Sequence, residues 1–516
     1  MSEECMRERA DQLKGEVHRM FEAGKTTMSM ADALTFVDTL EHLGISLHFR
    51  KEIDSVLGLV HSDEELEFAS SNDLHIVALR FRLLRQHGFW VSADVFDKFK
   101  DGNGSFSAGL CGKPRDLLSL YNAAHMAIPR EDALDDAIAF ARQHLEAVKG
   151  ELRSPMAEQV SRALDIPLPR YMPRLEAMHY IAEYAQEEAH DPLLLELAKL
   201  DFNLVRSVHL RACSVDRWWR KVYDDVKLNF CRDRAVEMYF WTFEMLPWEE
   251  CSRSRIILTK IIGLATFMDD SYDCYATFED CERFDEAIQR WEEQESAVSI
   301  IPEYLRPLYL ETLSHFNEFR GLMKPHEKHR MDYLIKEYKM QSRLYLQEAK
   351  WSSEKSMPTF KEHSKVSVMS SFVPTLCLVA LVCAEEDVAT EAAYEWAIRM
   401  PDMYIASGEI GRFLNDVSSY KRGKNKDVAS SVECYVKEHG VMGDEAAAAI
   451  AAMVELAWRR INKGCLEMDH EVLRAARIVV GMSATLEVMY LGGRDGYTFG
   501  KDIKDLVVPL FVEPMV

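Results

Sequence analysis

Apolar side chains recur along most of the sequence at the spacing of an α-helix. In the stretch 73–88, for example, one stripe is formed by Ile76, Leu79, Leu83 and Leu84. The stretches 233–246 and 446–463 have a similar helix-forming composition. Sustained alternation of the strand type is absent, so the pattern predicts an all-α protein.

Breaks in this pattern suggest how the chain is divided. The 516 residues include only 16 prolines and 23 glycines, which mark loops such as 101–114 and 491–501. The chain is longer than one hydrophobic core usually supports, and a polar break lies near 186–192. We therefore expect two helical domains, over 1–190 and 191–516, with the chemistry in the second.

Composition and charge narrow the class of function. Acidic residues outnumber basic ones by 85 to 62, for a net charge of -23. This balance argues against nucleic-acid binding, which needs a basic stripe, and an anionic substrate would need local cations. The eleven cysteines are scattered without a C-x-x-C spacing, and the start has neither an apolar signal core nor transit-peptide character. These features predict a cytoplasmic protein.

One uncharged run, residues 366–384, approaches the length of a membrane span. It contains Pro374 and several hydroxyl side chains. We interpret it as a buried helix that is kinked at Pro374, where the backbone donor is missing, and that lines an internal cavity. No membrane association is expected.

Three aspartates follow the apolar stretch IILTKIIGLATFM. On a helix, Asp269 and Asp273 project about 40° apart, and Asp270 about 100° from the first. Convergent acids beside an apolar run are costly unless cations neutralise them, and Mg²⁺ prefers carboxylate oxygens, water and phosphate. The cluster therefore suggests a magnesium site. For a DDxxD pattern alone, a helix end with solvated aspartates is the alternative.

A second polar stripe occurs about 140 residues later, where Arg412, Asn415 and Ser419 fall within about 60° on a helix. An amide oxygen and a hydroxyl at this spacing can ligate a second hard cation. An ordinary polar helix surface is the alternative for this stripe. Upstream, Arg232 and Arg234 would diverge by about 200° on a helix, so they can bind one anion together only in a non-helical segment that enters the next helix.

Near the end, a glycine-rich turn is surrounded by Tyr490, Asp495 and Tyr497. Such a loop could act as a lid that carries aromatic faces and a carboxylate. A surface loop whose tyrosines pack on the core is the alternative.

Taken in order, these segments resemble the plant terpene synthase family. The resemblance rests on an RxR element, a DDxxD motif, an NSE-type motif that begins at Asn415, and a Tyr-x4-Asp-x-Tyr segment; framework stretches are 78–88, 117–125, 197–209 and 428–440. It implies a C-terminal class I α-barrel and an N-terminal α/α barrel-like domain without chemistry of its own. No DxDD motif is present, so ionisation and not protonation should start the reaction.

The resemblance also implies roles for individual residues. Two magnesium ions would be held by Asp269, Asp270 and Asp273, and a third by Asn415 and Ser419, with Mn²⁺ as a possible substitute. Substrate diphosphate would be bound by Arg232, Arg234 and Arg412, and through the metal ligands Asp269, Asp273 and Asn415. Trp241 would stabilise the carbocation by a cation–π contact. The lid would be formed by Tyr490, Asp495 and Tyr497, the last two taking part in proton transfer.

The implied activity is that of a magnesium-dependent carbon–oxygen lyase. It would ionise farnesyl diphosphate, cyclise or quench the carbocation and release diphosphate, as a monomer. Missing transit-peptide character and the absence of an RR-x8-W element favour this sesquiterpene assignment. A monoterpene synthase that acts on geranyl diphosphate is the alternative.

One position departs from the family pattern. Gly423 stands where the second metal motif ends in a carboxylate, on the same helical face as Asn415, and the nearest acid after it is Asp427. We expect a raised magnesium requirement or slower ionisation, tested by comparison with Gly423→Glu. The departure also leaves open a nearly inactive protein that binds prenyl diphosphate without turnover.

Overall fold

The computed structural model describes residues 2–62, 71–211, 213–247, 249, 251–423 and 429–516. Helices dominate these residues, and no β-strand forms among them apart from one isolated bridge between Lys100 and Phe106. The all-α prediction is confirmed. The periodic stretch 73–88, for instance, forms α5 (Leu74–Gln86), whose first turn is capped by the Asp73 carboxylate accepting from the Ile76 amide at 3.3 Å.

The chain forms two compact units. Unit 1 comprises 1–210, 462–473 and 506–516, and unit 2 comprises 211–461 and 474–505. The domain boundary that we expect near residue 190 remains a prediction. The later segments 462–473 and 506–516 also belong to unit 1. No change of composition in the sequence indicates this return.

The helices of unit 1 enclose their own apolar core. They are α1 (Glu3–Thr27), α2 (Met30–His42), α3 (Arg50–Ser62), α5, α6 (Pro114–Ala124), α7 (Asp132–Val148), α8 (Met156–Asp165), α9 (Pro173–Tyr184) and α10 (Pro192–Arg211), with α25 (Lys504–Phe511) near the end of the chain. The core is formed by side chains such as Leu34, Phe81 and Leu117, which solvent does not reach.

A network of charged side chains is buried beside this core. The guanidinium of Arg162 on α8 binds the carboxylates of Glu176, at 3.3 Å, and Glu183, both on α9. His42 on α2 contacts the other oxygen of Glu176 at 2.8 Å. Burial alone would raise the pKa of Glu176, but His42 and Arg162 lower it to about 2. The carboxylate is therefore ionised inside the unit.

Unit 2 contains the helices that carry the candidate chemistry. They are α11 (Cys213–Val226), α12 (Ala235–Met245), α13 (Ser252–Cys274), α14 (Phe278–Arg290), α15 (Glu295–Val298), α16 (Arg306–Leu322), α17 (Arg330–Ser353), α18 (Phe360–Ser370), α19 (Val373–Cys383), α20 (Glu391–Ala397), α21 (Asp402–Lys421) and α22 (Ser431–His439). Most of α23 (Gly443–Leu466) and of α24 (His470–Tyr490) also belongs to unit 2, apart from their residues within 462–473.

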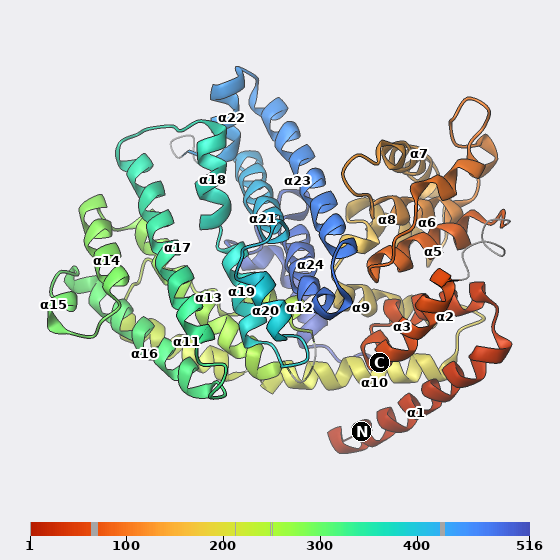
Figure 1. Ribbon diagram of the computed structural model, residues 1–516, viewed down its shortest axis with the longest axis horizontal. Coiled ribbons are helices and arrows are strands. Elements are labelled where there is room, and N and C mark those ends of the chain that lie inside the picture. Colours follow the sequence, from red (N-terminus) through yellow and green to blue (C-terminus); the bar gives the residue numbers. More distant parts are fainter. Residues whose placement is uncertain (1, 63–70, 212, 248, 250, 424–428) are drawn as a thin grey trace. The chain divides into compact units, whose positions relative to one another are not determined.

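Helix α13 is the central element of unit 2. It packs against α11, α12, α16, α17 and α19, and α21 packs against α18, α19 and α22 (Figure 1). In α13, the stretch from Leu264 to Met268 is buried on every face, which explains why an apolar run precedes the aspartates. At Gly263 an added Cβ would lie 3.0 Å from the Trp218 ring, so glycine permits the close packing of α11.

The uncharged run 366–384 forms parts of two helices, α18 and α19, and not one kinked helix. The break falls at Ser371 and Phe372, whose φ of 65° is left-handed. The kink predicted at Pro374 is therefore wrong, since this proline lies in the first turn of α19, where a missing N–H costs nothing. By length and composition 360–383 could cross a membrane, but 78% of its most apolar window is buried inside the protein.

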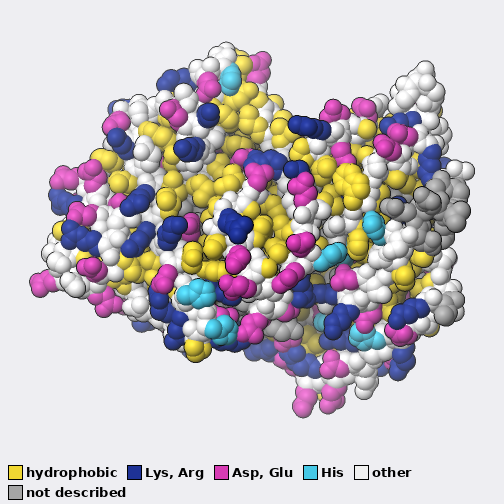
Figure 2. Space-filling model, in the orientation of Figure 1, with side chains coloured by type: hydrophobic (Ala, Val, Ile, Leu, Met, Phe, Trp, Pro, Cys, Tyr) yellow, Lys and Arg dark blue, Asp and Glu magenta, His cyan; other side chains and the backbone are white. Residues whose placement is uncertain are grey.

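Acidic and basic side chains are interspersed over the face drawn in Figure 2. The net negative charge is therefore not gathered in one patch on that face.

Candidate functional site

The three predicted aspartates lie in the last turns of α13. Asp270 is buried, Asp269 is half-buried and Asp273 is reached by solvent. Burial, followed by the charge of Asp270, raises the pKa of Asp269 to about 7. Although solvent reaches the side chain of Asp273, the protein atoms packed around it and, next, the charge of Asp269 raise its pKa well above the usual range. Carboxylates that repel one another in this way favour the binding of divalent cations.

Asp270 has a different neighbourhood from the other two. One carboxylate oxygen lies 3.4 Å from the Arg234 Nη2 atom, and the other accepts from the Arg232 backbone amide at 3.4 Å. Asp270 therefore attaches the arginine segment to α13. Asp269 and Asp273 remain as the pair best placed for cations.

The two upstream arginines lie in a non-helical segment that enters α12, as their joint binding of an anion requires. Arg234 occupies the N-cap position of α12 and is buried, whereas Arg232 is exposed. The Arg232 side chain donates to the Thr498 carbonyl at 3.5 Å, so it also contacts the predicted lid. Burial lowers the pKa of Arg234, but nearby Tyr497 and Asp270 raise it above its usual value.

Tyr497 connects three parts of unit 2. Its ring stacks on Trp241 with 4.7 Å between ring centroids, and its hydroxyl is hydrogen-bonded to Thr266 on α13. The guanidinium of Arg234 lies 4.9 Å from the centre of the same ring. Burial raises the pKa of Tyr497 to about 12, so the phenol is neutral. One face of the Trp241 indole is thus covered by an aromatic ring and not by water.

The second polar stripe lies on α21. The Asn415 amide donates through Nδ2 to the Tyr490 hydroxyl at 3.2 Å. This bond uses the amide nitrogen, so Oδ1, the atom that would ligate a cation, points away from Tyr490. Ser419 is half-buried one turn further along.

Tyr490 and Asp495 occupy different positions in the predicted lid. Tyr490 is the last residue of α24 and is 8% exposed, so it is a fixed helix end and not part of a loop. Asp495 is buried in the turn that follows, where its carboxylate accepts from the Thr498 amide at 2.9 Å. The charge of Asp495, after burial, raises the pKa of Tyr490. The side chains of Tyr490 and Asp495 are therefore close enough to interact electrostatically.

Glu348 on α17 belongs to the same cluster but was missed from the sequence. Its Oε1 atom lies 3.8 Å from the Arg412 Nη2 atom. Its charge contributes to the raised pKa values of Asp269 and Asp273. Its position in the sequence could have indicated this, because Glu348 falls on the same helix face as Gln341 and Tyr345, which are buried. An acid on a buried helix face needs a partner. The predicted residues are thus joined through α13, α17, α21 and α24.

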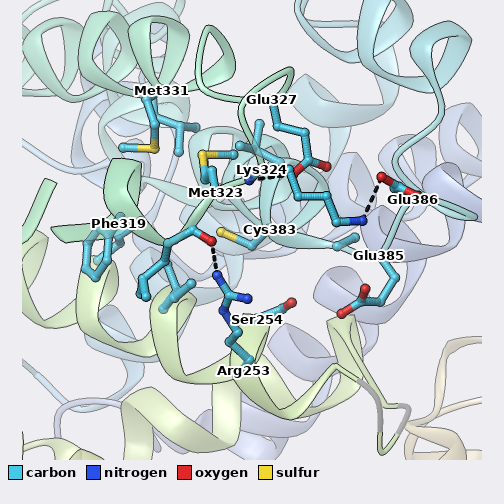
Figure 3. Close-up of a pocket in the computed structure, with 16 residues that line it drawn as sticks. Arg253, Ser254, Phe319, Met323, Lys324, Glu327, Met331, Cys383, Glu385 and Glu386 are labelled. Carbon is cyan, nitrogen blue, oxygen red and sulfur yellow. Dashed lines mark hydrogen bonds and ion pairs between the residues drawn. The ribbon is translucent and has the colours of Figure 1, made fainter. Parts of the chain in front are cut away.

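Figure 3 shows a pocket at the other end of α13, lined by residues such as Arg253, Met331 and Cys383. None of the predicted site residues lines it. At its rim the Lys324 ammonium donates to Glu386 at 2.7 Å. His326, Glu327 and Glu386 bring ligand atoms within 4.8 Å of one another there, but this lysine already neutralises Glu386. The pocket is separate from the aspartate cluster.

We expect the affinity for Mg²⁺ to rise about tenfold between pH 6 and pH 8, because Asp269, with a pKa of about 7, must lose its proton before it can bind a cation. The raised pKa stabilises the metal-free protein below pH 7, and this contribution is lost as the pH rises through 7. The rise in Tm that Mg²⁺ causes should therefore be larger at pH 8. Titration calorimetry and thermal unfolding at both pH values measure these effects, and equal affinities would contradict the expectation.

Gly423 does not lie on the helical face assumed for the motif. Helix α21 ends at Lys421, and Gly423 follows it with a φ of 68°; among the described residues, no atom lies within 4 Å of the position that a Cβ would take there. Its amide donates to the Tyr420 carbonyl at 2.9 Å, which is typical of a glycine that terminates a helix. The assumption that a side chain at 423 shares the Asn415 face is therefore wrong for this chain. Asp427 lies outside the described residues.

The substitution Gly423→Glu should lower the free energy of unfolding by about 1 kcal/mol, because a non-glycine residue is strained at this φ. It should leave the magnesium requirement unchanged. Gly423→Asn is the matched control, since asparagine tolerates left-handed backbone. Denaturant unfolding and a magnesium titration of activity give the answer, and a lower magnesium requirement in the glutamate variant alone would contradict the helix-end account.

Comparisons with known proteins identify two family domains in this chain. The model of the terpene synthase N-terminal domain matches residues 1–164, and that of the terpene synthase metal-binding domain matches residues 220–460. A eudesmanediol synthase of Zea mays is 53% identical, over 100% of this chain and 92% of the relative. A tau-cadinol synthase of the same species is 42% identical, over 99% and 93%.

A solved structure supports the same assignment. Isoprene synthase from grey poplar, in complex with three Mg²⁺ ions and dimethylallyl-S-thiolodiphosphate, superposes with a TM-score of 0.90. It is 30% identical, and the match covers 99% of this chain and 98% of that protein. The two family models together match more than half of the chain, and the relatives match nearly all of it, so the chain belongs to the terpene synthase family.

Proposed function

We propose that this terpene synthase ionises farnesyl diphosphate, converts the carbocation to a sesquiterpene and releases diphosphate. The observation that carries the proposal is the juxtaposition of Asp269 and Asp273, on α13, with Arg412 on α21. The charges of both aspartates act on Arg412. Burial lowers the pKa of Arg412, but the charges of Glu348, Asp416 and these two aspartates raise it above its usual value. A cluster with both signs of charge suits an anion held through cations. The names of the relatives from Zea mays support a C15 product.

The donor set fits magnesium. Asp269 and Asp273 would hold cations on one side, and Asn415 with Ser419 on the other, with Mn²⁺ as a substitute. When bound, divalent cations neutralise the diphosphate and stabilise the charge that develops on it as it leaves. The raised pKa values of the two aspartates support this assignment, because a cation would take the place of the retained protons.

The remaining residues bind the anion and exclude water. Arg232, Arg234 and Arg412 would bind diphosphate through charge-assisted hydrogen bonds. Trp241 and Tyr497 present stacked rings that can shield and stabilise a cation. Because burial raises the pKa of Tyr497 to about 12, the phenol stays protonated and would not act as the base in any late proton transfer. Asp495, in its buried turn, is the candidate acceptor.

The test is incubation of the purified chain with farnesyl or geranyl diphosphate, with Mg²⁺ or with a chelator. Gas chromatography should show a sesquiterpene product from farnesyl diphosphate that depends on the metal. Monoterpene formation from geranyl diphosphate alone would replace the proposal with the C10 alternative. Diphosphate binding without any product would indicate a silent homologue.

We further propose a monomeric cytoplasmic protein. Buried thiols such as Cys231, Cys377 and Cys434, which form no disulfide among the described residues, are compatible with a reducing compartment. Gel filtration and microscopy of a fluorescent fusion test the two statements separately.

A further inference from the structure

Asp416 lies next to Asn415 in the second metal motif, yet its carboxylate is engaged within the protein. It is 5% exposed. Its Oδ2 atom accepts a hydrogen bond from the Ser431 backbone amide, in the first turn of α22, at 2.8 Å. Its Oδ1 atom lies 3.8 Å from the Arg412 Nη1 atom. One buried side chain thus joins the start of α22 to Arg412 of α21.

Arg412 is held from several directions. Its Nε atom donates to the Ser367 carbonyl at 2.9 Å, and its Nη2 atom donates to the Ser370 hydroxyl at 3.1 Å. Nη2 also lies 3.8 Å from Glu348. These contacts restrain Nε and Nη2, whereas Nη1 has its ion-pair contact with Asp416. The carboxylate of Asp416 therefore restrains Nη1, the third nitrogen of the guanidinium group.

The start of α22 is well suited to hold this carboxylate. The first amides of a helix have no partner within the helix, and they favour negative charge. The Ser430 hydroxyl caps the Glu433 amide at 3.5 Å, and Asp416 takes the Ser431 amide. A carboxylate that is fixed by a backbone donor cannot rotate freely away from Arg412.

We propose that Asp416 is a positioning residue for diphosphate binding: the first-turn amide of α22 orients its carboxylate, and the carboxylate orients Arg412. This inference rests on the function proposed above. It predicts that losing either link weakens the binding of diphosphate while α22 remains folded.

The first link is tested by Ser431→Pro, which removes the amide hydrogen but keeps the helix start. Proline is tolerated in the first position of a helix, and the preceding Ser430, with φ -118° and ψ 168°, has the extended conformation that proline requires before it. Ser431→Ala is the matched control, because it keeps the amide and removes only a buried hydroxyl that has no partner among the described residues. The second link is tested by Asp416→Asn, which can still accept from the Ser431 amide but loses its charge toward Arg412.

The readout is the Kd of inorganic diphosphate in saturating Mg²⁺, measured by calorimetry, together with KM and kcat for farnesyl diphosphate. We expect Ser431→Pro and Asp416→Asn each to raise the Kd about fivefold to tenfold, and Ser431→Ala to leave it unchanged. KM should rise with the Kd. Thermal unfolding of each variant reports whether α22 and the rest of unit 2 remain folded.

Lower Tm values with an unchanged diphosphate Kd would overturn the inference, since Asp416 would then only stabilise α22. A wild-type-like Kd in Asp416→Asn overturns it even if Ser431→Pro does not fold. Failure of the proposed function is distinguishable, because the unsubstituted chain itself would then neither bind diphosphate with Mg²⁺ nor turn over farnesyl diphosphate.

Discussion

Replacing Asp269 by asparagine should lower the turnover of farnesyl diphosphate by about 10²-fold to 10³-fold. The substitution removes one of the two carboxylates that converge on α13 and so weakens the hold on a cation, and the loss of a group that stabilises developing charge in a water-poor site commonly costs this much. It also removes the group whose pKa of about 7 makes metal binding depend on pH. Single-turnover kinetics at saturating Mg²⁺ measure the loss.

The matched control for this experiment is Asp224→Asn, because Asp224 is an exposed acid on α11 in a pair that lacks a third acid at the required spacing. It should retain full turnover. The pH dependence of Mg²⁺ affinity should also become smaller in Asp269→Asn alone, with the remainder due to Asp273, whose pKa is raised as well. If both variants were equally active, the aspartate cluster would not be the metal site, and the proposed reaction would lose its main support.

Replacing Arg162 by alanine should lower the free energy of unfolding by about 3–5 kcal/mol. The change leaves Glu176 and Glu183 buried on α9 without their guanidinium partner, and breaking a buried charge network costs this much. Arg220→Ala is the control, because its ion pair with Asp216 is exposed and should contribute little to the free energy of unfolding. Denaturant unfolding followed by circular dichroism compares the two variants.

Acid titration provides a second measurement of the same network. The pKa of Glu176 is lowered in the folded protein to about 2. Its stabilising contribution is therefore present above pH 4.5 and is lost as the pH falls toward 2. Arg162→Ala should lose less stability over this range than the unsubstituted chain. Equal losses would show that the network does not determine the acid sensitivity of unit 1.

Much of the site could be predicted from the sequence because its parts are local. The spacing of Asp269 and Asp273 fixes their common helix face once the segment is helical. The requirement that Arg232 and Arg234 lie outside a helix is likewise a matter of local geometry. Their role in substrate binding remains a prediction, since it came from the resemblance to the family and not from spacing.

Other features depend on which segments meet in space. Asp270 belongs to the motif by spacing, but its contacts with the Arg232 and Arg234 segment assign it a structural task. Glu348 has no motif of its own and joins the cluster only because α17 packs against α13. The break at Phe372 was placed wrongly at Pro374, because proline interrupts helix interiors but is tolerated in a first turn.

The sequence by itself determined the all-α class, the helical positions of the acidic and amide side chains, and the family. Each of these depends on periodicity or on residues in one short segment. The tertiary structure decided that Tyr490 is a helix end that orients Asn415, that Gly423 terminates α21, and that Asp416 connects α22 to Arg412. These features depend on where each helix ends and on which other segments its end contacts. The energy of such contacts is set by burial and not by local spacing.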